Sequence, residues 1–297
     1  MWKNNEMDEV VAKAAGMIEA LPFIQRFRNE TVVVKFGGSM LDDEEACRSI
    51  LQDIAFMEVV GLRPVVVHGG GKAISRRMEE VRLTPRFVHG LRVTDEETMG
   101  LVEEALHQEV NPHLVEIISS FGCRAQGIHG NDIVRVVRKI TTDPDTGDPM
   151  DLGYVGEVQD VDTAPIRASL DAQTVPVVTP LGRGEDGHTY NVNADETAAS
   201  MARALRARKL VYLSDVPGLL EDPGDPSTLI SHVEAEDVEE LIGRGIIQGG
   251  MIPKMRSAVK TLGAGVSKVH IIDSALRHSL LMELFTERGV GTEIVRS

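Results

Sequence analysis

The sequence is poor in cysteine and has no long hydrophobic run near its start. Two cysteines, Cys47 and Cys123, occur in 297 residues, and they lack the close spacing of metal-binding thiols. Because disulfides are rare in reducing compartments, we expect a cytoplasmic protein in which both thiols are buried as small hydrophobic side chains. Residues 1–23 contain no apolar run of the length that a signal peptide or a membrane span requires.

Positive charge is also scarce. Lys and Arg number 31 against 46 Asp and Glu, which gives a net charge of −15 and a pI near 5.1. Nucleic-acid-binding proteins carry a basic stripe, and none offsets this acidic composition, so we exclude nucleic acid as a partner. An anionic small molecule is not excluded, because a few local donors are enough to bind it.

Several common catalytic motifs are absent. The chain has no G-x-x-x-x-G-K-[ST], H-E-x-x-H, G-x-S-x-G or C-x-x-C sequence. The segment "GRGEDG" (182–187) matches G-x-G-x-x-G, but "HTYNVNAD" separates it from the next expected helix. No helix N-terminus would then lie where a pyrophosphate sits, so we expect a glycine-rich surface loop there.

What the sequence does contain is an alternation of strand-like and helical patterns. Apolar residues at three- and four-residue spacing predict a helix over residues 8–28. Strands are expected at 31–36, 64–68, 123–128, 133–138, 175–179, 210–213 and 268–272. Amphipathic helices are expected at 43–60, 72–81, 95–120, 195–207, 234–243 and 253–263. This alternation predicts one α/β unit with a mostly parallel sheet covered on both faces.

One polar, turn-rich segment interrupts the alternation. "TTDPDTGDPMDLGYVG" (141–156) is expected to form a hairpin or loop over one end of the sheet. The chain shows no internal repeat and no low-complexity linker. We therefore expect two lobes of one unit rather than separate domains.

Two predicted strands end in glycines. Lys35 and Gly37-Gly38 follow "VVV", and Gly70-Gly71 follow "PVVVH". Beyond the carboxyl ends of parallel strands, glycines let the backbone approach an anion closely, and a following helix offers free N–H groups. The alternative is that each pair only forms a tight turn. Two such junctions favour one polyphosphate or two anionic reactants.

Three later segments have the same character. "NVNAD" places Asp195 ahead of a helix, where it is either a helix N-cap or a functional carboxylate. Ser214 and Asp215 follow a strand in a polar turn that suits a nucleotide. Gly249 and Gly250 precede a helix that begins near Lys254, where a lysine opposes the helix dipole and is mildly unfavourable for structure alone.

Six ordered motifs in the chain resemble those of the N-acetylglutamate kinases in the amino-acid-kinase superfamily. They are "KFGG", "VHGGG", "GLRVTDEET" (90–98), "NVNAD", "LSDVPGLL" (213–220) and "GGMIPK" (249–254). The resemblance implies a three-layer αβα sandwich with a mostly parallel central sheet. It also implies a helical extension over residues 1–30 and a kinase domain over residues 31–297. Within that domain, the acetylamino-acid lobe would span about 31–180 and the ATP lobe about 181–297.

The implied reaction is ATP-dependent phosphorylation of the γ-carboxylate of N-acetyl-L-glutamate, the second step of arginine synthesis. By resemblance, the catalytic residues are Lys35, Lys254 and Asp195. The substrate-binding residues would be Gly70, Gly71, Arg92, Asn191 and Asn193. The nucleotide-binding residues would be Gly37, Gly38, Ser214, Asp215, Gly249 and Gly250. Mg²⁺ is expected to be held through the nucleotide phosphates, without protein ligands.

Two departures from the family pattern keep alternatives open. Asn131 stands where many relatives carry lysine, and Lys72 replaces a frequent proline. One alternative is a kinase of a related acetylated amino acid such as N-acetyl-aminoadipate, since one methylene changes binding by only about 1–3 kcal/mol. Another is a catalytically silent effector-binding protein. The presence of both lysines and the aspartate argues against the second.

The resemblance further implies feedback inhibition by arginine. Residues 268–295 resemble the C-terminal signature of arginine-inhibited members, which are hexamers (trimers of dimers) joined through N-terminal helices. His270, Glu283 and Gly289 would line the effector site, and Glu283 would supply negative charge for a cationic ligand. Gln25 stands where relatives often carry a basic residue. This departure would weaken the contact with the carboxylate of arginine unless Arg26 or Arg28 takes the place of that basic residue.

Overall fold

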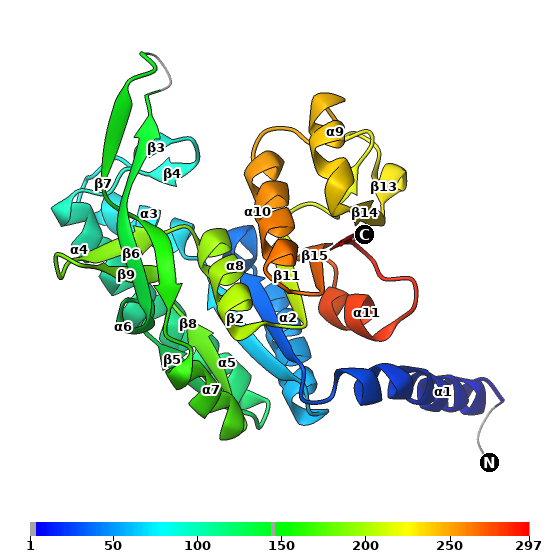
Figure 1. The fold of residues 1–297 in the computed structure, drawn as a ribbon. Coiled ribbons are helices and arrows are strands. Elements are labelled where there is room, and N and C mark those ends of the chain that lie inside the picture. Colours follow the sequence, from blue (N-terminus) through cyan, green and yellow to red (C-terminus); the bar gives the residue numbers. More distant parts are fainter. Residues whose placement is uncertain (1–3, 144–145, 297) are drawn as a thin grey trace.

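The valine-rich segments predicted as strands form the middle of an eight-stranded sheet (Figure 1). β1 (Thr31–Phe36) pairs in parallel with β2 (Arg63–His68) on one side and with β11 (Lys209–Ser214) on the other. The three valines of β1 are fully buried. A near-continuous apolar run is what a strand covered on both faces requires.

The computed structural model describes residues 4–143 and 146–296. Residues 1–3 of the predicted extension and 144–145 of the predicted excursion lie outside the described residues. Within the described chain, no helix is both long enough and apolar enough to cross a membrane.

The sheet is mostly parallel, as the alternation predicts. Its strands, in spatial order, are β14 (His232–Glu234), β16 (Thr292–Val295), β15 (Lys268–Asp273), β11, β1, β2, β8 (Thr174–Val178) and β5 (Arg124–Ile128). Among neighbouring pairs, only β15 and β16 are antiparallel. β1, β2, β8 and β5 belong to the predicted first lobe, and β11, β15, β16 and β14 belong to the second. The division into lobes stays a prediction.

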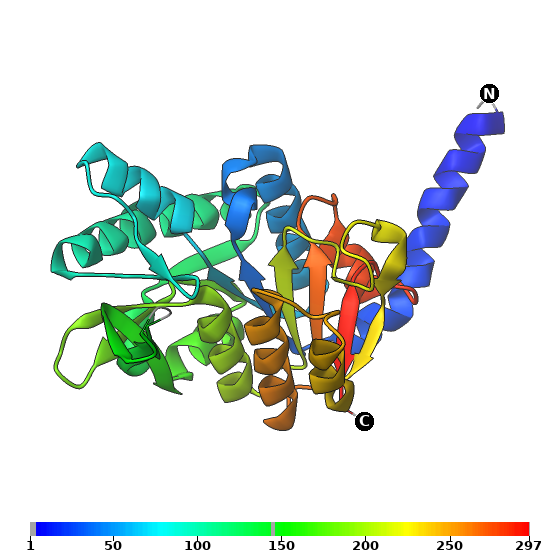
Figure 2. The ribbon, with the colours of Figure 1, turned by 90° about the horizontal axis from the view of Figure 1, so that it is seen from above.

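Helices cover both faces of this sheet (Figure 2). One face carries α2 (Glu44–Val59), α3 (Gly71–Glu80), α4 (Glu96–Glu104), α5 (Asn111–Ser120) and α11 (Ser279–Phe285). The other carries α7 (Ala164–Asp171), α8 (Ala194–Leu205), α9 (Val238–Gly243) and α10 (Met251–Gly263). Each layer encloses its own buried cluster against the sheet, so the predicted three-layer αβα sandwich is confirmed.

The helix predicted over residues 95–120 exists, with a change of winding in its middle. A π-helical stretch, Ala105–Val110, joins α4 to α5. It brings Leu106 so close to the loop after β2 that a Cβ added to Gly70 would lie 2.4 Å from Leu106 Cδ2. Glycine at this position therefore allows the helix and the loop to pack together.

A small barrel stands on one end of the sandwich. It consists of β6 (Val134–Thr142), β7 (Pro149–Val161), β9 (Leu181–Gly184) and β10 (Thr189–Val192). β6 and β7 form the hairpin that the excursion predicts, and it rises above the rest of the molecule in Figure 1.

The prediction of a surface loop over residues 182–187 is wrong for its first half. Gly182 and Gly184 belong to β9, and Gly187 lies in the turn to β10. A Cβ on Gly182 would lie 2.3 Å from Val136 Cγ1, so the glycine lets β9 pack tightly against β6 inside the barrel.

The remaining elements are short. They are β3 (Phe87–Val88), β4 (Leu91–Arg92), α6 (Gly130–Ile133), β12 (Leu219–Leu220), β13 (Leu229–Ile230) and the 3₁₀ turns Gly38–Asp42, Pro226–Thr228 and Ala235–Asp237. Segments of two to five residues are too short to show a helical or strand period. The sequence therefore did not predict them, except that Ala235–Asp237 lies within the helix expected at 234–243.

The predicted N-terminal helix is confirmed as α1 (Asn4–Phe27), which projects from the body of the molecule (Figures 1 and 2). Its C-terminal part packs near α11, whereas several apolar side chains along its length are exposed. The exposed ones are Met7, Val10, Val11, Met17, Ile18 and Leu21. Such a stripe is expected on a helix that packs against another surface.

A buried histidine fixes the end of β2. His68 is fully buried, with Nδ1 2.7 Å from Gly69 O and Nε2 3.1 Å from Asn111 Nδ2. The Asn111 amide also donates to Val177 O, at 2.8 Å. Since the amide donates to Nε2, the imidazole is neutral and Nδ1–H donates to Gly69 O. Burial lowers the pKa of His68 to about 4, although the hydrogen bond to Gly69 opposes this.

We predict that this histidine makes the fold sensitive to mild acid. The pKa of His68 in the folded protein lies below the unfolded value of 6.5. At a pH between these two values, the unfolded chain is protonated at His68 and the folded chain is not. Lowering the pH from 7 to 5 should remove about 2 kcal/mol of the stability contributed by His68. In urea denaturation, the stability gap between wild type and His68→Gln should shrink by this amount. A gap independent of pH would contradict a neutral, buried imidazole.

Candidate active site

The loops after β1 and β2 meet at the carboxyl edge of the sheet. Gly69 N donates to Phe36 O at 2.6 Å, and a Cβ added to Gly37 would lie 3.1 Å from Gly69 N. Parallel neighbouring strands necessarily end at the same edge, which explains why glycines thirty residues apart become neighbours. Gly38 adopts φ +87°, a conformation that favours glycine.

Three charged side chains converge beside these loops and form what we term the ion triad: Lys35, Asp195 and Lys254. Lys35 Nζ lies 3.1 Å from Asp195 Oδ1, and Lys254 Nζ lies 3.3 Å from Asp195 Oδ2. The lysine side chains are 13% and 14% exposed, and the aspartate is 25% exposed. The sequence separates these residues by up to 219 positions, yet the structure brings all three predicted catalytic residues together.

The triad leaves one net positive charge facing the loops. Burial alone would raise the pKa of Asp195, but the ammonium groups of Lys35 and Lys254 outweigh it and hold the pKa below its ordinary value. The carboxylate is therefore ionised at neutral pH and pairs with both lysines. Lys254 Nζ also lies 5.3 Å from the ring centroid of buried Tyr212, a favourable distance for a cation over an aromatic face.

The start of α8 decides between the two alternatives that the sequence left open for Asp195. Asn193, rather than Asp195, caps this helix, because Asn193 Oδ1 accepts hydrogen bonds from the N–H groups of Asp195 and Glu196 at 2.8 and 3.2 Å. Asp195 lies in the first turn, and its side chain turns to the lysines. The predicted substrate residue Asn193 thus has a capping role, and it also lines the cleft described next.

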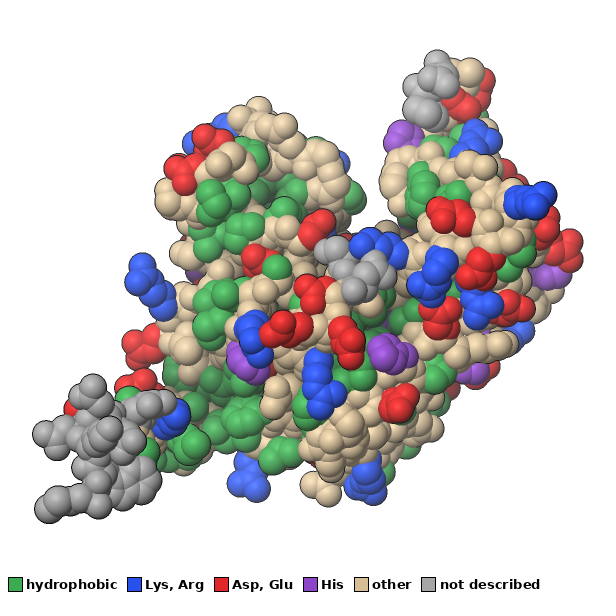
Figure 3. Space-filling view, turned by 180° about the vertical axis from the view of Figure 1, so that it is seen from behind, with side chains coloured by type: hydrophobic (Ala, Val, Ile, Leu, Met, Phe, Trp, Pro, Cys, Tyr) green, Lys and Arg blue, Asp and Glu red, His purple; other side chains and the backbone are tan. Residues whose placement is uncertain are grey.

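A cleft of about 280 Å³ adjoins the triad on the β2 side. It is lined by Lys35, Gly38, Gly69, Gly70, Gly71, Ile74, Phe87, Gly90, Leu91, Arg92, Leu106, Val155, Pro180, Asn191, Val192, Asn193 and Ala194. All five predicted substrate-binding residues are among them. Figure 3 shows the surface hollowed between the β6–β7 hairpin and the part that carries α9.

Arg92 is the buried cation of this cleft. Its guanidinium donates to Gly71 O and Ser75 Oγ, both at 2.8 Å, and contacts Met78 Sδ at 3.1 Å, so none of these partners is charged. It also lies 4.7 Å from the centroid of the Phe87 ring. Burial lowers the pKa of Arg92, but an arginine stays protonated in proteins. A buried cation paired with neutral groups is suited to an incoming anion.

Two wall residues of the cleft, Asn191 and Val155, come from the barrel, and the buried Thr94 contacts Asn191 from outside the barrel. Asn191 Nδ2 lies 3.2 Å from Thr94 Oγ1, and Thr94 donates in turn to Arg92 O at 2.8 Å. Val155 on β7 pairs with Asn191 on β10. Sequence analysis missed Thr94, Phe87 and Val155, since an apolar residue or a buried threonine looks like ordinary core. The predicted position of Asn191 gave the only signal for this wall.

Four predicted nucleotide-binding residues, Ser214, Asp215, Gly249 and Gly250, lie on the other side of β1, whereas Gly37 and Gly38 directly follow β1 and Gly38 also lines the cleft. Ser214 ends β11 and Asp215 follows it, with Ser214 Oγ 3.4 Å from Asp215 Oδ1. Gly249 adopts φ +53°, and Gly250 directly precedes α10, the helix that carries Lys254. The ion triad therefore stands between this side and the cleft. Across residues 4–143 and 146–296, no group of three or more His, Cys, Asp or Glu side chains is placed to hold a metal ion.

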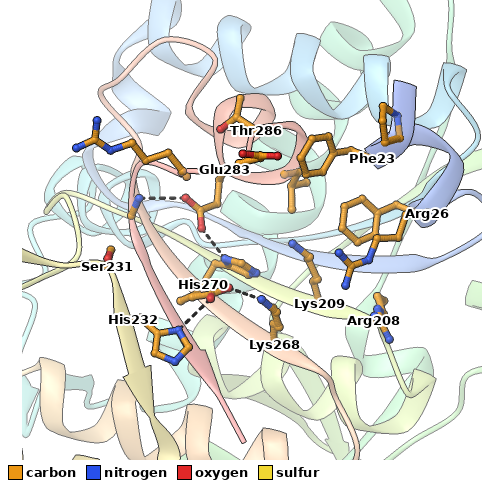
Figure 4. Close-up of a pocket in the computed structure, with 18 of the residues that line it drawn as sticks. Phe23, Arg26, Arg208, Lys209, Ser231, His232, Lys268, His270, Glu283 and Thr286 are labelled. Atoms are coloured by element: carbon orange, nitrogen blue, oxygen red, sulfur yellow. Dashed lines mark hydrogen bonds and ion pairs between the residues drawn. The ribbon is translucent and has the colours of Figure 1, made fainter. Parts of the chain in front are cut away.

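A second cavity, of about 620 Å³, lies at the opposite edge of the sheet (Figure 4). We call it the α1 cavity, because α1 lines it with Glu19, Pro22, Phe23, Arg26 and Phe27. Its other lining residues are Arg208, Lys209, Ser231, His232, Lys268, His270, Glu283, Leu284, Thr286, Glu287, Arg288, Gly289, Gly291 and Glu293. The three predicted effector residues are among them. Gln25 is not in the lining, whereas Arg26 is.

Glu283 is a buried carboxylate in this cavity. Its Oε1 lies 2.6 Å from His270 Nδ1, and its Oε2 accepts from the N–H groups of Val290 and Gly291 at 2.7 and 3.0 Å. Burial would raise the pKa of Glu283, but these contacts outweigh it and lower the pKa. Burial also lowers the pKa of His270. Gly289 has φ +61°, and a Cβ there would lie 2.8 Å from Glu283 Oε2.

Cationic groups line the same cavity, and sequence analysis missed them. Lys209 begins β11, and burial lowers its pKa to about 8, with the nearby Lys268 acting in the same direction. Glu293 pairs with Lys268 at 2.6 Å and with His232 at 3.0 Å. These residues come from adjacent strands, so only the pairing of β11, β15, β16 and β14 brings them together. The cavity thus offers both a carboxylate and cations.

Known proteins resemble this chain over nearly its whole length. A family model described as "Amino acid kinase family" matches residues 30–273. An acetylglutamate kinase of Akkermansia muciniphila is 45% identical over 294 residues, covering 99% of both chains. An acetylglutamate kinase of Methanocaldococcus jannaschii is 43% identical over 296 residues, covering 98% of this chain and 99% of the other.

Solved structures resemble the whole fold. An N-acetylglutamate synthase from Neisseria gonorrhoeae, complexed with coenzyme A and N-acetyl-glutamate, superimposes with a TM-score of 0.83 at 30% identity. It covers 96% of this chain, whereas this chain spans 63% of the synthase. A carbamate kinase from Giardia lamblia shares the fold, with a TM-score of 0.65 at 14% identity over 91% of this chain. The family match and the identity to its relatives show that this chain belongs to the amino acid kinase family.

Proposed function

We propose that the chain is an ATP-dependent kinase that phosphorylates the γ-carboxylate of N-acetyl-L-glutamate. The observation that carries the proposal is the ion triad, which holds two lysines between the cleft that contains Arg92 and the residues predicted to bind the nucleotide. The names of relatives that are 42–45% identical over nearly the full chain support the same substrate. Two buried free thiols are consistent with a reducing, cytoplasmic location.

The reaction brings two anions together. An oxygen of the substrate carboxylate attacks the γ-phosphorus of ATP, the bond to the β,γ-bridging oxygen breaks, and ADP leaves with that electron pair. No proton has to move, because the attacking carboxylate is already ionised. Two unit charges about 4 Å apart repel by roughly 4 kcal/mol at an effective dielectric near 20, so the site must supply positive charge.

Lys35 and Lys254 supply that charge from opposite sides of the transferring group. Asp195 holds both ammonium groups in place, so they need not reorganise during the reaction. The N–H groups of the glycine loops after β1 and β2 can donate to the same phosphate oxygens. Mg²⁺ would be held through the nucleotide phosphates and would neutralise part of their charge. Asp195 would not serve as a metal ligand, because it is already paired with the lysines.

The cleft would bind the acceptor. Arg92 presents a buried guanidinium that fits the α-carboxylate of the acetylated amino acid. Asn191, with its amide near Thr94, can hydrogen-bond the acetylamino group. A cleft of about 280 Å³ is sized for one small amino-acid derivative.

We further propose that L-arginine binds in the α1 cavity and inhibits the enzyme. Glu283 offers a desolvated carboxylate to a guanidinium, and Lys209 and Arg26 offer cations to the α-carboxylate of the same ligand. The exposed apolar stripe of α1 suits self-association, so we propose a hexamer of three dimers joined through this helix.

The substrate is tested by a coupled ADP-release assay. We expect N-acetylglutamate to give the highest kcat/KM among N-acetylglutamate, N-acetyl-aminoadipate, glutamate and aspartate. Free amino acids lack the acetyl group that Asn191 would bind, and the longer acceptor misplaces its carboxylate. A higher kcat/KM for another acceptor would overturn the substrate assignment and leave the phosphoryl-transfer chemistry standing.

The lysines and Arg92 should separate kinetically. Lys35→Ala and Lys254→Ala should lower kcat by about 10²–10³-fold, because their charge matters most in the transition state. Arg92→Ala should mainly raise KM for the acetylated amino acid. Lys260→Ala, on the exposed side of the same helix as Lys254, is the control and should leave both parameters unchanged. Equal KM effects from all three variants would contradict the assigned roles.

Regulation is tested by deleting residues 1–28. The truncated protein should keep its activity, fall from a hexamer to a dimer by light scattering, and lose or weaken inhibition by arginine. Glu283→Gln should weaken inhibition while the hexamer persists, because it removes the carboxylate and leaves α1 intact. If the full chain is a dimer that millimolar arginine does not inhibit, the regulatory proposal is wrong and the catalytic one is unaffected.

A further inference from the structure

Two acidic residues stand side by side at the start of α8, and they face different surroundings. Asp195 pairs with the lysines of the ion triad, whereas Glu196 reaches the small barrel. Glu196 Oε2 lies 3.0 Å from Lys139 Nζ on β6, and its Oε1 accepts from Val158 N on β7, also at 3.0 Å. One carboxylate therefore contacts both strands of the β6–β7 hairpin. The side chains of Glu196 and Lys139 are each 25% exposed, so water only partly screens the pair.

Irregularities in the hairpin leave the partners of Glu196 available. The register of β6 and β7 shifts between Arg135 and Val136, and again between Arg138 and Ile140. Lys139 falls at the second shift and has no paired residue on β7. Bulges of this kind redirect a side chain away from the regular ladder. The Val158 N–H likewise bonds to the carboxylate of Glu196.

β7 continues from this contact into the wall of the cleft. Val155, three residues before Val158, lines the cleft and pairs with Asn191 on β10. The preceding residue, Tyr154, donates its N–H to Thr94 O at 2.6 Å. Any shift of β7 relative to α8 would therefore move Val155 and Asn191 relative to Asp195.

We propose that Glu196, together with Lys139, is a positioning residue that fixes the acceptor wall on the helix that organises the ion triad. The inference rests on the proposed function, because it assumes that the cleft binds the acceptor and the triad stabilises the transferring group. Glu196 itself does not contact either reactant. It sets the distance between them through β7 on one side and the neighbouring Asp195 on the other.

The test compares variants of Lys139 and Glu196 with a control variant of Arg138, which is the neighbour of Lys139 on β6. Lys139→Met and Glu196→Gln should each raise KM for the acetylated amino acid about 10-fold and lower kcat by a similar factor, because a small misplacement of the acceptor is costly. KM for ATP should change less than about twofold. Lys139→Arg keeps a cation within reach of Glu196 and should restore wild-type values.

Arg138→Met is the matched control. Arg138 precedes Lys139 and pairs with Asp151 on the same hairpin, at 2.8 Å, but does not contact α8. This variant should leave both KM values and kcat unchanged. Thermal unfolding of all four variants shows whether any kinetic effect accompanies a loss of stability.

A purely structural role makes a different set of predictions. A lower melting temperature with unchanged kinetic constants at 25 °C would overturn the proposal, and so would equal increases in KM for both substrates. If Glu196→Gln fails to fold, the Lys139 variants decide the question. If wild type prefers another acceptor, the same comparison is made with that acceptor, so failure of the substrate assignment is distinguishable from failure of the positioning role.

Discussion

The pairing of the partly buried Asp195 carboxylate with two lysines is the interaction around which the rest of the structure is arranged. Lys35 comes from β1, Asp195 from α8 and Lys254 from α10, so the triad forms only when three separate elements reach their final positions. Two ammonium groups this close would repel each other without the carboxylate between them. The cost of holding them is met by the surrounding fold, and the result is positive charge that is in place before any anion arrives.

The parallel sheet makes this arrangement possible. Because β2, β1 and β11 run in the same direction, their carboxyl ends present loops to one edge, where the cleft and the predicted nucleotide-binding residues flank the triad. The buried contacts of His68 with Gly69 and Asn111 tie the glycine loop after β2 to α5 and, through Val177 O, to β8. The glycines allow the two loops to approach each other closely, and the hydrogen bonds of His68 and Asn111 restrict the mobility of the loop after β2.

The sequence predicted the parts of the molecule that are encoded locally. Valine-rich strands, long amphipathic helices and glycine-lysine junctions are each recognisable from a few consecutive residues. The three residues of the ion triad were predicted from their resemblance to family motifs. The hairpin of β6 and β7 was predicted, but its closure into a barrel was not, because β9 and β10 are only four residues long and pair with strands that are distant in the sequence. Lys209, Lys139 and Glu196 looked like ordinary charged residues. Their roles depend on burial and on register shifts, which arise only when the chain is folded.

β11 runs from the α1 cavity to the predicted nucleotide-binding side of the triad. Lys209 begins β11 in the α1 cavity, and Ser214 ends it on the nucleotide side, a distance of about 17 Å at the rise of an extended strand. β11 is buried and paired on both edges, so it cannot stretch or slip without breaking its ladder. If arginine binds in the α1 cavity as proposed, it would therefore act by moving elements at the margin of the sheet, such as α1 and α11. The effect on catalysis would depend on how the neighbours of those elements hold them.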